Sequence, residues 1–159
     1  MRILMVSDTH GKLDNFMKAV DKTAPVDMII HCGDVEGDEE RIRAYVDCPV
    51  VMVRGNNDFF SDLPWEETVE AAGLKIFVTH GPHYNVSMGP ERLIDEAKDR
   101  KVDIALFGHT HKPAVHYDDG LYLVNPGSLS YPRQDGRRPS YVVMSTDNAG
   151  NPLFTINYL

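Results

Sequence analysis

Along the first third of the chain, short continuous hydrophobic runs alternate with segments in which hydrophobic residues recur every three or four positions. Runs at residues 3–6, 28–30 and 50–53 are typical of strands that are buried on both faces. Helical spacing at residues 13–20 and 38–46 predicts a helix after each of the first two strands. This part of the chain therefore has the strand, helix, strand order of an α/β protein.

Later in the chain, hydrophobic runs pair across turns. Residues 68–71 and 74–78 flank Ala72-Gly73, which predicts a hairpin that ends at His80. Pro90 suits the first turn of a third helix, because proline lacks the N–H group that remains unpaired there. Further strands are predicted at residues 104–107, 121–124, 141–144 and 153–158, and Asp119-Gly120 predicts the turn of a hairpin that leads into residues 121–124. We therefore expect the C-terminal part to be mostly antiparallel β-structure.

A length of 159 residues with 42% hydrophobic residues allows a substantial core, and we expect a single domain over residues 1–159. No hydrophobic run is long enough to cross a bilayer, and the N-terminus lacks a basic stretch followed by a leader-like hydrophobic segment. Cys32 and Cys48 are the only cysteines and have no CxxC spacing, which favours a reducing compartment. We therefore expect a cytoplasmic protein with no membrane partner.

The formal net charge of −8 argues against a nucleic-acid polymer as partner, because such binding depends on Lys and Arg side chains that neutralise phosphates. A small anionic substrate is still compatible with this charge. Carboxylates that bind divalent cations lose much of their local negative charge, so the net charge alone does not describe a metal site.

Short polar clusters follow the hydrophobic runs and carry the candidate chemistry. They are Asp8-Thr9-His10-Gly11, Gly33-Asp34, Gly55-Asn56-Asn57-Asp58, His80-Gly81 and Gly108-His109-Thr110-His111. Loops beyond the carboxyl ends of strands bind ligands in open α/β sheets, so these clusters can converge. Taken singly, each cluster is ordinary turn chemistry. As an ordered set of carboxylate, amide and imidazole groups, they indicate a site for two metal ions.

Spacing within the clusters supports this interpretation. Asp8 and His10 are two positions apart, as are His109 and His111, so an extended backbone would direct each pair to one side, toward a shared site. A glycine also lies beside each group of candidate ligands. The missing Cβ permits positive φ and close approach of the backbone to an ion or a phosphate.

The clusters resemble the ordered signature of the calcineurin-like metallophosphoesterases, which is D-x-H, G-D, G-N-H-[DE], H-G and G-H-x-H. The similarity is closest to the small bacterial and archaeal phosphodiesterase branch, because of the short chain, the Asn125-Pro126-Gly127-Ser128 segment and the downstream Pro132-Arg133. It extends from Met1 to about Arg133.

This resemblance implies an α/β fold in which two mixed β-sheets pack as a sandwich with helices on the outer faces. In this four-layer αββα arrangement the metal centre lies at one edge. The implied activity is that of a metal-dependent phosphoesterase, and we expect a phosphodiesterase that acts on a small phosphodiester. A hydroxide that bridges two metal ions is the implied nucleophile.

The resemblance also implies a set of metal ligands. The first ion would be held by Asp8, His10 and His111, and the second by Asn56, His80 and His109, with Asp34 bridging both. Mixed nitrogen and oxygen ligands suit transition metals better than Ca²⁺. We expect two divalent ions, with manganese first and iron, zinc or nickel as alternatives.

One departure from the signature concerns the chemistry. Asn57 stands where the family often has a histidine, and an amide cannot exchange a proton near neutral pH. General acid catalysis contributes roughly 10²–10⁴-fold, so we expect slow turnover of poor leaving groups and better turnover of aryl phosphodiesters. Asn57 and Asp58 are the predicted catalytic residues, and Asp58 is expected to orient the asparagine pair. The predicted substrate contacts are Asn57, Ser128 and Arg133.

Two alternatives share the fold. One is a non-catalytic protein-binding scaffold, like the eukaryotic trafficking scaffold that resembles this branch but has altered metal positions. The other is a nuclease of the same superfamily, although those enzymes are usually longer and have added DNA-facing segments. The sequence leaves open the physiological substrate, the native metal and the oligomeric state. The hydrophobic C-terminal hairpin offers an edge for homo-oligomer formation.

Overall fold

The N-terminal part of the chain and the C-terminal hairpin form one sheet of the computed structural model, which describes residues 1–159. In spatial order its strands are β10 (Pro152–Tyr158), β9 (Ser140–Thr146), β1 (Arg2–Val6), β2 (Met28–His31) and β3 (Val50–Met52). The last three strands are parallel and are connected by α1 (Asp14–Thr23) and α2 (Glu39–Tyr45). β9 runs antiparallel to both of its neighbours. The carboxyl ends of β1, β2 and β3 therefore lie along one edge.

The second sheet is also mixed. In spatial order it contains β4 (Glu66–Ala71), β5 (Leu74–Thr79), β6 (Ile104–Leu106), β8 (Leu121–Pro126) and β7 (Pro113–Asp118). β5, β6 and β8 are parallel, and the two edge strands are antiparallel to their neighbours. Between β5 and β6 lie a 3₁₀ helix, η1 (Pro82–Tyr84), and α3 (Glu91–Asp99).

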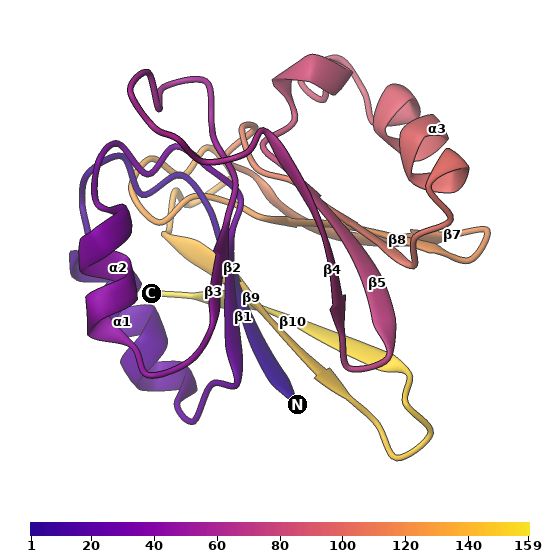
Figure 1. Ribbon diagram of the computed structural model, residues 1–159, viewed down its shortest axis with the longest axis horizontal. Helices are drawn as coiled ribbons and strands as arrows, with labels where there is room; N and C mark the ends of the chain where they lie inside the picture. The colour runs from indigo at the N-terminus through magenta and orange to yellow at the C-terminus, as the bar shows by residue number, and fades with distance from the viewer.

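The sheets pack face to face, with α1 and α2 on one outer side and α3 on the other (Figure 1). β1 illustrates why this arrangement forms, since its side chains alternate between two cores. Ile3 and Met5 belong to the core between the sheets, and Leu4 packs with Phe16 of α1 on the outer side. A third core joins α3 to the outer face of the second sheet, where Leu93 is fully buried. These layers confirm the predicted α/β sandwich.

The predicted helices and strands are all present. The Ala72-Gly73 turn has positive φ at both residues, 55° and 78°, as a two-residue hairpin turn requires. The hairpin predicted at Asp119-Gly120 is also present and joins β7, most of whose side chains are exposed, to β8. No sequence pattern indicated η1, which begins two residues after His80. None of the helices combines the length and the hydrophobicity that are needed to traverse a membrane.

Candidate metal centre

The polar clusters meet at one edge of the sandwich, in the loops that follow β1, β2, β3, β5 and β6. Backbone hydrogen bonds join neighbouring loops: Asp8 N–H donates to the Gly33 carbonyl at 3.0 Å, and Gly108 N–H donates to the His80 carbonyl at 3.1 Å. Across the two sheets, His109 N–H donates to Asp8 Oδ2 at 3.2 Å. Packing of the sheets thus makes neighbours of residues that are 101 positions apart.

Asp8, His10 and His111 form one group of candidate ligands. His111 Nε2 lies 2.9 Å from Asp8 Oδ1, and His10 Nε2 lies 3.7 Å from the same oxygen. The two imidazole nitrogens are 3.4 Å apart. Atoms that bind one ion at about 2.1 Å are roughly 3.0–3.4 Å apart, so these separations suit a shared cation. The structure therefore brings together the three residues predicted to hold the first ion.

A second group consists of Asp8, Asp34 and His80. His80 Nε2 lies 3.3 Å from Asp34 Oδ2 and 4.0 Å from Asp8 Oδ1. Asp34 Oδ2 is also 3.8 Å from His10 Nε2, so Asp34 lies between histidines of the two predicted sets. The family resemblance implied that Asp34 alone is shared by both ions, whereas Asp8 belongs to both groups of candidate ligands in the structure.

Asn56 and His109 lie next to the second group. Asn56 Oδ1 is 3.0 Å from His109 Nδ1, and the ring centroids of His109 and His80 are 5.3 Å apart. His111 instead contacts Asp8 and His10. The spacing argument, which directed His109 and His111 to one shared site, is therefore wrong, and the two side chains diverge toward different groups.

The extended backbone assumed for these pairs is also wrong. Asp8, His10, His109 and His111 have φ of 56°, 47°, 66° and 58°. Residues with a Cβ seldom adopt this left-handed conformation, and it occurs mainly where the surrounding structure imposes it, often at functional sites. Tight left-handed turns, rather than strand alternation, direct these side chains into the centre.

Two glycines allow the loops to approach each other. A Cβ on Gly55 would lie 2.1 Å from Asp34 Oδ1, and a Cβ on Gly108 would lie 2.1 Å from Ser7 Oγ and 2.9 Å from Asp8 Oδ2. Such contacts are impossible without displacing the candidate ligands. At these two positions glycine is required for close approach and not for positive φ.

Hydrogen bonds at Nδ1 turn three imidazoles toward the centre. Each Nδ1 lies 2.7 Å from an oxygen, which is Glu36 Oε1 for His10, the Cys32 carbonyl for His80 and the Tyr131 carbonyl for His111. Because these oxygens accept, Nδ1 carries the proton and Nε2 of the neutral ring presents a lone pair. Metal-binding histidines are commonly oriented in this way. These three hydrogen-bond partners could not be predicted from the sequence. Every residue has a backbone carbonyl, whatever its type, and Glu36 lies outside the polar clusters.

Crowding of carboxylates and imidazoles shifts their protonation. Burial raises the pKa of the Asp8 carboxyl, but its contacts with His10 and His111 outweigh burial and hold that pKa well below its usual range. Burial lowers the pKa of His10, and the carboxylates of Asp8 and Glu36 raise it to about 9. Without a cation, imidazolium groups balance the carboxylates. Any metal ion must displace these protons, so metal binding and protonation compete.

Two buried atoms test whether a cation fits. When the surrounding imidazoles are neutral and carry their proton on Nδ1, Asp8 Oδ1 and His80 Nε2 are both buried and have no hydrogen-bond partner. Leaving a buried polar atom unpaired costs about 1–3 kcal/mol, more for a charged group. Both atoms can donate lone pairs, and they face each other at 4.0 Å. A divalent cation is the group that satisfies both at once, so the residues present fit a metal centre.

Asn57 and Asp58 have different places in the site. Asn57 donates its backbone N–H to Asp34 Oδ1 at 2.8 Å and its side-chain amide to Asp34 Oδ2 at 2.7 Å. Asp58 is buried and accepts hydrogen bonds from the backbone N–H groups of Asp34, Gly55 and Glu36. Both of its carboxylate oxygens accept these hydrogen bonds, so Asp58 positions the loops of the centre.

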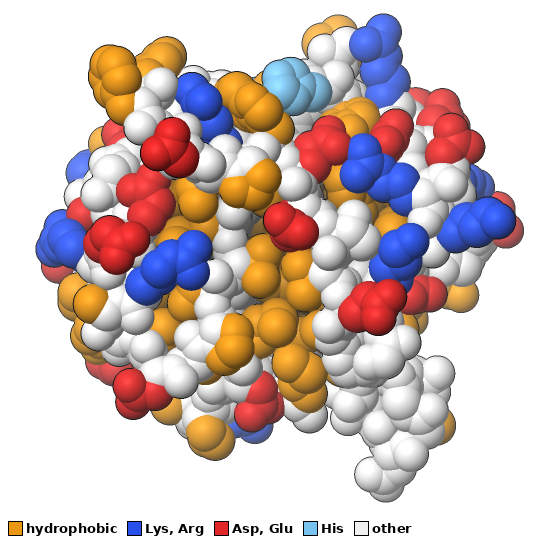
Figure 2. Space-filling model, in the orientation of Figure 1, with side chains coloured by type: hydrophobic (Ala, Val, Ile, Leu, Met, Phe, Trp, Pro, Cys, Tyr) orange, Lys and Arg blue, Asp and Glu red, His pale blue; other side chains and the backbone are white.

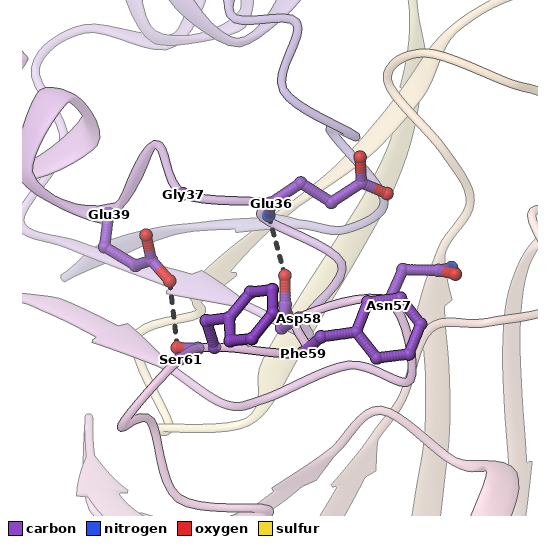
Figure 3. A pocket seen from close by; sticks show the side chains of 8 residues that line it. Glu36, Gly37, Glu39, Asn57, Asp58, Phe59 and Ser61 are labelled. Atoms are coloured by element: carbon purple, nitrogen blue, oxygen red, sulfur yellow. Dashed lines mark hydrogen bonds between the residues drawn. The ribbon is translucent and has the colours of Figure 1, made fainter.

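An acidic cleft of about 540 Å³ lies beside this loop, and its lining includes Glu36, Glu39, Asn57, Asp58 and Phe59. In Figure 3 the carboxylate of Glu36 and the amide of Asn57 point the same way, away from Glu39. Because Glu36 also contacts His10, the cleft opens next to the metal centre.

The predicted substrate contacts Ser128 and Arg133 differ in exposure. Ser128 is fully buried: its hydroxyl donates to the Asp8 carbonyl at 2.9 Å and accepts from the N–H groups of Ser130 and Tyr131. Because its hydroxyl is buried and makes all of these hydrogen bonds, Ser128 does not contact a substrate. The prediction of Ser128 as a substrate contact is therefore wrong, and Ser128 positions the Asp8 loop instead. Arg133 is exposed and lines a groove beside His10 and His111.

Comparison with known proteins places the chain among phosphoesterases. Residues 1–149 match the family model described as the calcineurin-like phosphoesterase superfamily domain. The chain is 35% identical over 150 residues to the probable metallophosphoesterase YsnB of Bacillus subtilis strain 168, which covers 93% of this chain and 86% of that protein. It is 31% identical over 148 residues to the phosphodiesterase MJ0936 of Methanocaldococcus jannaschii, covering 80% of this chain and 83% of that protein.

Solved structures agree on the fold. A predicted phosphoesterase from Streptococcus pneumoniae TIGR4 superposes with a TM-score of 0.83 at 28% identity, covering 99% of this chain and 88% of that one. Wild-type Vps29 from Entamoeba histolytica, complexed with zinc, superposes with a TM-score of 0.80 at 21% identity, covering 99% of both chains. The second likeness concerns the fold alone.

Proposed function

The chain belongs to the calcineurin-like phosphoesterase superfamily, and we propose that it is a phosphodiesterase that hydrolyses a small phosphodiester with two divalent metal ions. The observation that carries this proposal is the pair of buried, unpartnered ligand atoms, Asp8 Oδ1 and His80 Nε2, at the meeting point of the two candidate groups. The similarity to the phosphodiesterase MJ0936 supports a diester as substrate.

In the proposed mechanism, Asp8, His10 and His111 would hold one ion and Asn56, His80 and His109 would hold the other, with Asp34 contributing to both. When bound, such ions lower the pKa of an attacking water molecule and neutralise charge on the phosphoryl oxygens. The mixed nitrogen and oxygen donors favour manganese, with iron, zinc and nickel as alternatives.

The chain's own groups complete the site. Glu36, Cys32 and Tyr131 hold the imidazoles in the orientation that directs Nε2 inward. The Asn57 amide lines the acidic cleft and lies 2.7 Å from Asp34 Oδ2, where it can donate to a phosphoryl oxygen. It has no proton to give to a leaving group, so the leaving oxygen departs without general acid assistance from this residue.

The proposal is tested by assaying phosphomonoesters, phosphodiesters and single-stranded DNA with Mn²⁺, Ni²⁺, Zn²⁺ and Mg²⁺. We expect metal-dependent hydrolysis of aryl phosphodiesters that stops when EDTA is added. Cleavage of DNA strands would instead favour the nuclease. Protein that binds metal but hydrolyses none of these substrates would favour the scaffold and contradict the proposal.

Replacing Asn57 by histidine is expected to raise activity selectively on diesters with alkyl leaving groups. An imidazole at this position can protonate the leaving oxygen, and general acid catalysis contributes roughly 10²–10⁴-fold. We expect the ratio of kcat/KM for alkyl over aryl diesters to rise about tenfold or more. Asn57→Ala, which removes the amide without adding an acid, is the matched control. An equal change for both classes of substrate in Asn57→His would contradict the assignment of Asn57.

A further inference from the structure

A groove with basic lining borders the metal centre. Lys112, Arg133 and Arg137 line it together with the candidate metal ligands His10 and His111, and its volume is about 690 Å³. We call this surface the basic groove. Its volume lies within the range of small-molecule sites, roughly 300–1,000 Å³, and exceeds what one phosphate group needs. A molecule bound at the metal centre can therefore extend into the basic groove.

The floor of the basic groove is attached to a metal ligand. Arg133 N–H donates to the His111 carbonyl at 3.0 Å, and Tyr131 accepts a hydrogen bond from His111 Nδ1 at 2.7 Å. The preceding residue Ser130 donates through its hydroxyl to the Thr9 carbonyl at 2.6 Å. These bonds hold the segment that carries Arg133 at a defined position beside the reacting centre.

The charges of the basic groove are free to bind an anion. Lysine and arginine side chains form ion pairs in this structure only at Arg41, Lys98 and Arg100. None of the three cations of the basic groove has a carboxylate partner, although the chain has 24 acidic and 16 basic residues. Lys12, which lies over the Tyr131 ring at 4.4 Å, adds a further positive charge nearby. A local excess of unpaired cations in an acidic protein favours binding of a compact anion.

The acidic cleft, on the other side of the metal centre, has a lining of opposite charge. The acidic cleft is lined by Glu36, Glu39 and Asp58 and by no lysine or arginine. Its lining also includes Phe59 and Phe60, which are 69% and 103% exposed. Hydrophobic side chains gather on the corresponding loop between β3 and β4, at the upper left of Figure 2. His10 lines the basic groove and contacts Glu36 of the acidic cleft, so the metal centre lies between them.

We propose that the basic groove binds a second phosphate group of the substrate, while an uncharged, preferably aromatic, arm lies on the side of the acidic cleft. The substrate class is then a phosphodiester that carries a further phosphate on one arm, and it binds in a single orientation. Charge repulsion excludes the anionic arm from the acidic cleft, whereas guanidinium groups match phosphate oxygens. This inference rests on the proposed phosphodiesterase function.

A matched pair of chromogenic esters tests it. Thymidine 5′-(4-nitrophenyl phosphate) and the same compound with a 3′-phosphate differ only in the second phosphate. In both, water adds to phosphorus, the bond from phosphorus to the aryl oxygen breaks, and 4-nitrophenolate leaves. With Mn²⁺ present we expect kcat/KM to be about tenfold or more higher for the 3′-phosphorylated ester, mainly through a lower KM.

Substitutions assign the preference to the basic groove. In the double variant Arg133→Gln and Arg137→Gln, the ratio of kcat/KM between the two esters is expected to fall toward one. Arg92→Gln changes an exposed arginine on α3 that lines neither cleft, and it is expected to keep the wild-type ratio. Calorimetry gives a readout that does not depend on turnover. The wild-type protein is expected to bind thymidine 3′,5′-bisphosphate about tenfold more tightly than thymidine 5′-monophosphate. The double variant is expected to bind the two nucleotides with similar affinity.

The outcomes separate this inference from the proposed function. Equal hydrolysis of both esters by the wild-type protein overturns the second-phosphate site and leaves the phosphodiesterase intact. A preference that survives in the double variant also overturns it. If neither ester is hydrolysed with any of the four metals, the proposed function fails, and the calorimetric comparison then decides whether the basic groove recognises a second phosphate.

Discussion

Replacing Asp8 by asparagine is expected to lower kcat/KM for an aryl phosphodiester by at least about 10³-fold. Asp8 Oδ1 belongs to both candidate groups of metal ligands and has no other partner. Metal ions contribute several kcal/mol to transition-state stabilisation in hydrolases of this kind, and each 1.36 kcal/mol corresponds to a factor of ten in rate. An amide at this position keeps the shape of the side chain but loses the negative charge that balances the ions.

The same substitution is expected to remove the stabilisation that metal ions give to the fold. At a free metal concentration of 100 times the dissociation constant, binding to the native state contributes about 2.7 kcal/mol to unfolding free energy. For a protein of this size that raises Tm by roughly 5–10 °C. Thermal unfolding of the wild-type protein with Mn²⁺ and with EDTA measures this shift directly, and Asp8→Asn should show little of it.

Two further variants make the experiment decisive. Asp34→Asn removes the other central carboxylate. It is expected to lose both the activity and the metal-induced Tm shift, and it serves as the test if Asp8→Asn does not fold. Asp99→Asn changes an exposed aspartate at the end of α3 and should behave like the wild-type protein. Full activity and a full metal-induced Tm shift in both Asp8→Asn and Asp34→Asn would contradict the assignment of the centre.

Acid is expected to destabilise the protein through His31. This side chain is fully buried at the end of β2, where its Nδ1 accepts a hydrogen bond from Gly33 N–H at 3.1 Å and its Nε2 lies 3.0 Å from Thr9 Oγ1. Burial lowers the pKa of His31 from 6.5 to about 4. Protonation would also place an N–H group of the ring against the Gly33 N–H.

The sign of the effect follows from this lowered pKa. Between pH 6.5 and pH 4 the unfolded chain binds a proton at His31 that the folded protein does not, so the free energy of unfolding falls as the pH falls through this range. Above pH 6.5 His31 is neutral in both the folded and the unfolded protein, so its full contribution to the free energy of unfolding is present. A shift of this size corresponds to roughly 3 kcal/mol lost between pH 7 and pH 4.

Urea unfolding of the wild-type protein and of His31→Gln in EDTA, at pH 7 and pH 4.5, isolates this effect. The difference between the two proteins is the relevant quantity, because His10 has a raised pKa and its contribution has the opposite sign. His116→Gln, at an exposed position on β7, is the control. Identical losses of stability on acidification in the wild-type protein and in His31→Gln would contradict the prediction.

The sequence by itself determined the order of the main strands and helices and identified the candidate metal ligands. Local hydrophobic periodicity reports which face of an element is buried, so β1, α1 and β2 were readable from the pattern of residues 3–30. The polar clusters were recognisable because each follows a strand and each contains a type of side chain that binds metals. Both kinds of information are contained in short segments of the chain.

Tertiary structure alone decided how these residues meet. The contact between Asp8 and His109 joins residues 101 positions apart, and Ser128 reaches the Asp8 carbonyl across 120 positions. The positive φ of the candidate ligands, the Nδ1 partners and the separation of a basic groove from an acidic cleft all depend on how two sheets pack and on backbone groups that carry no sequence signature. Contacts between distant segments are set by the packing of the whole core, and no local pattern encodes them.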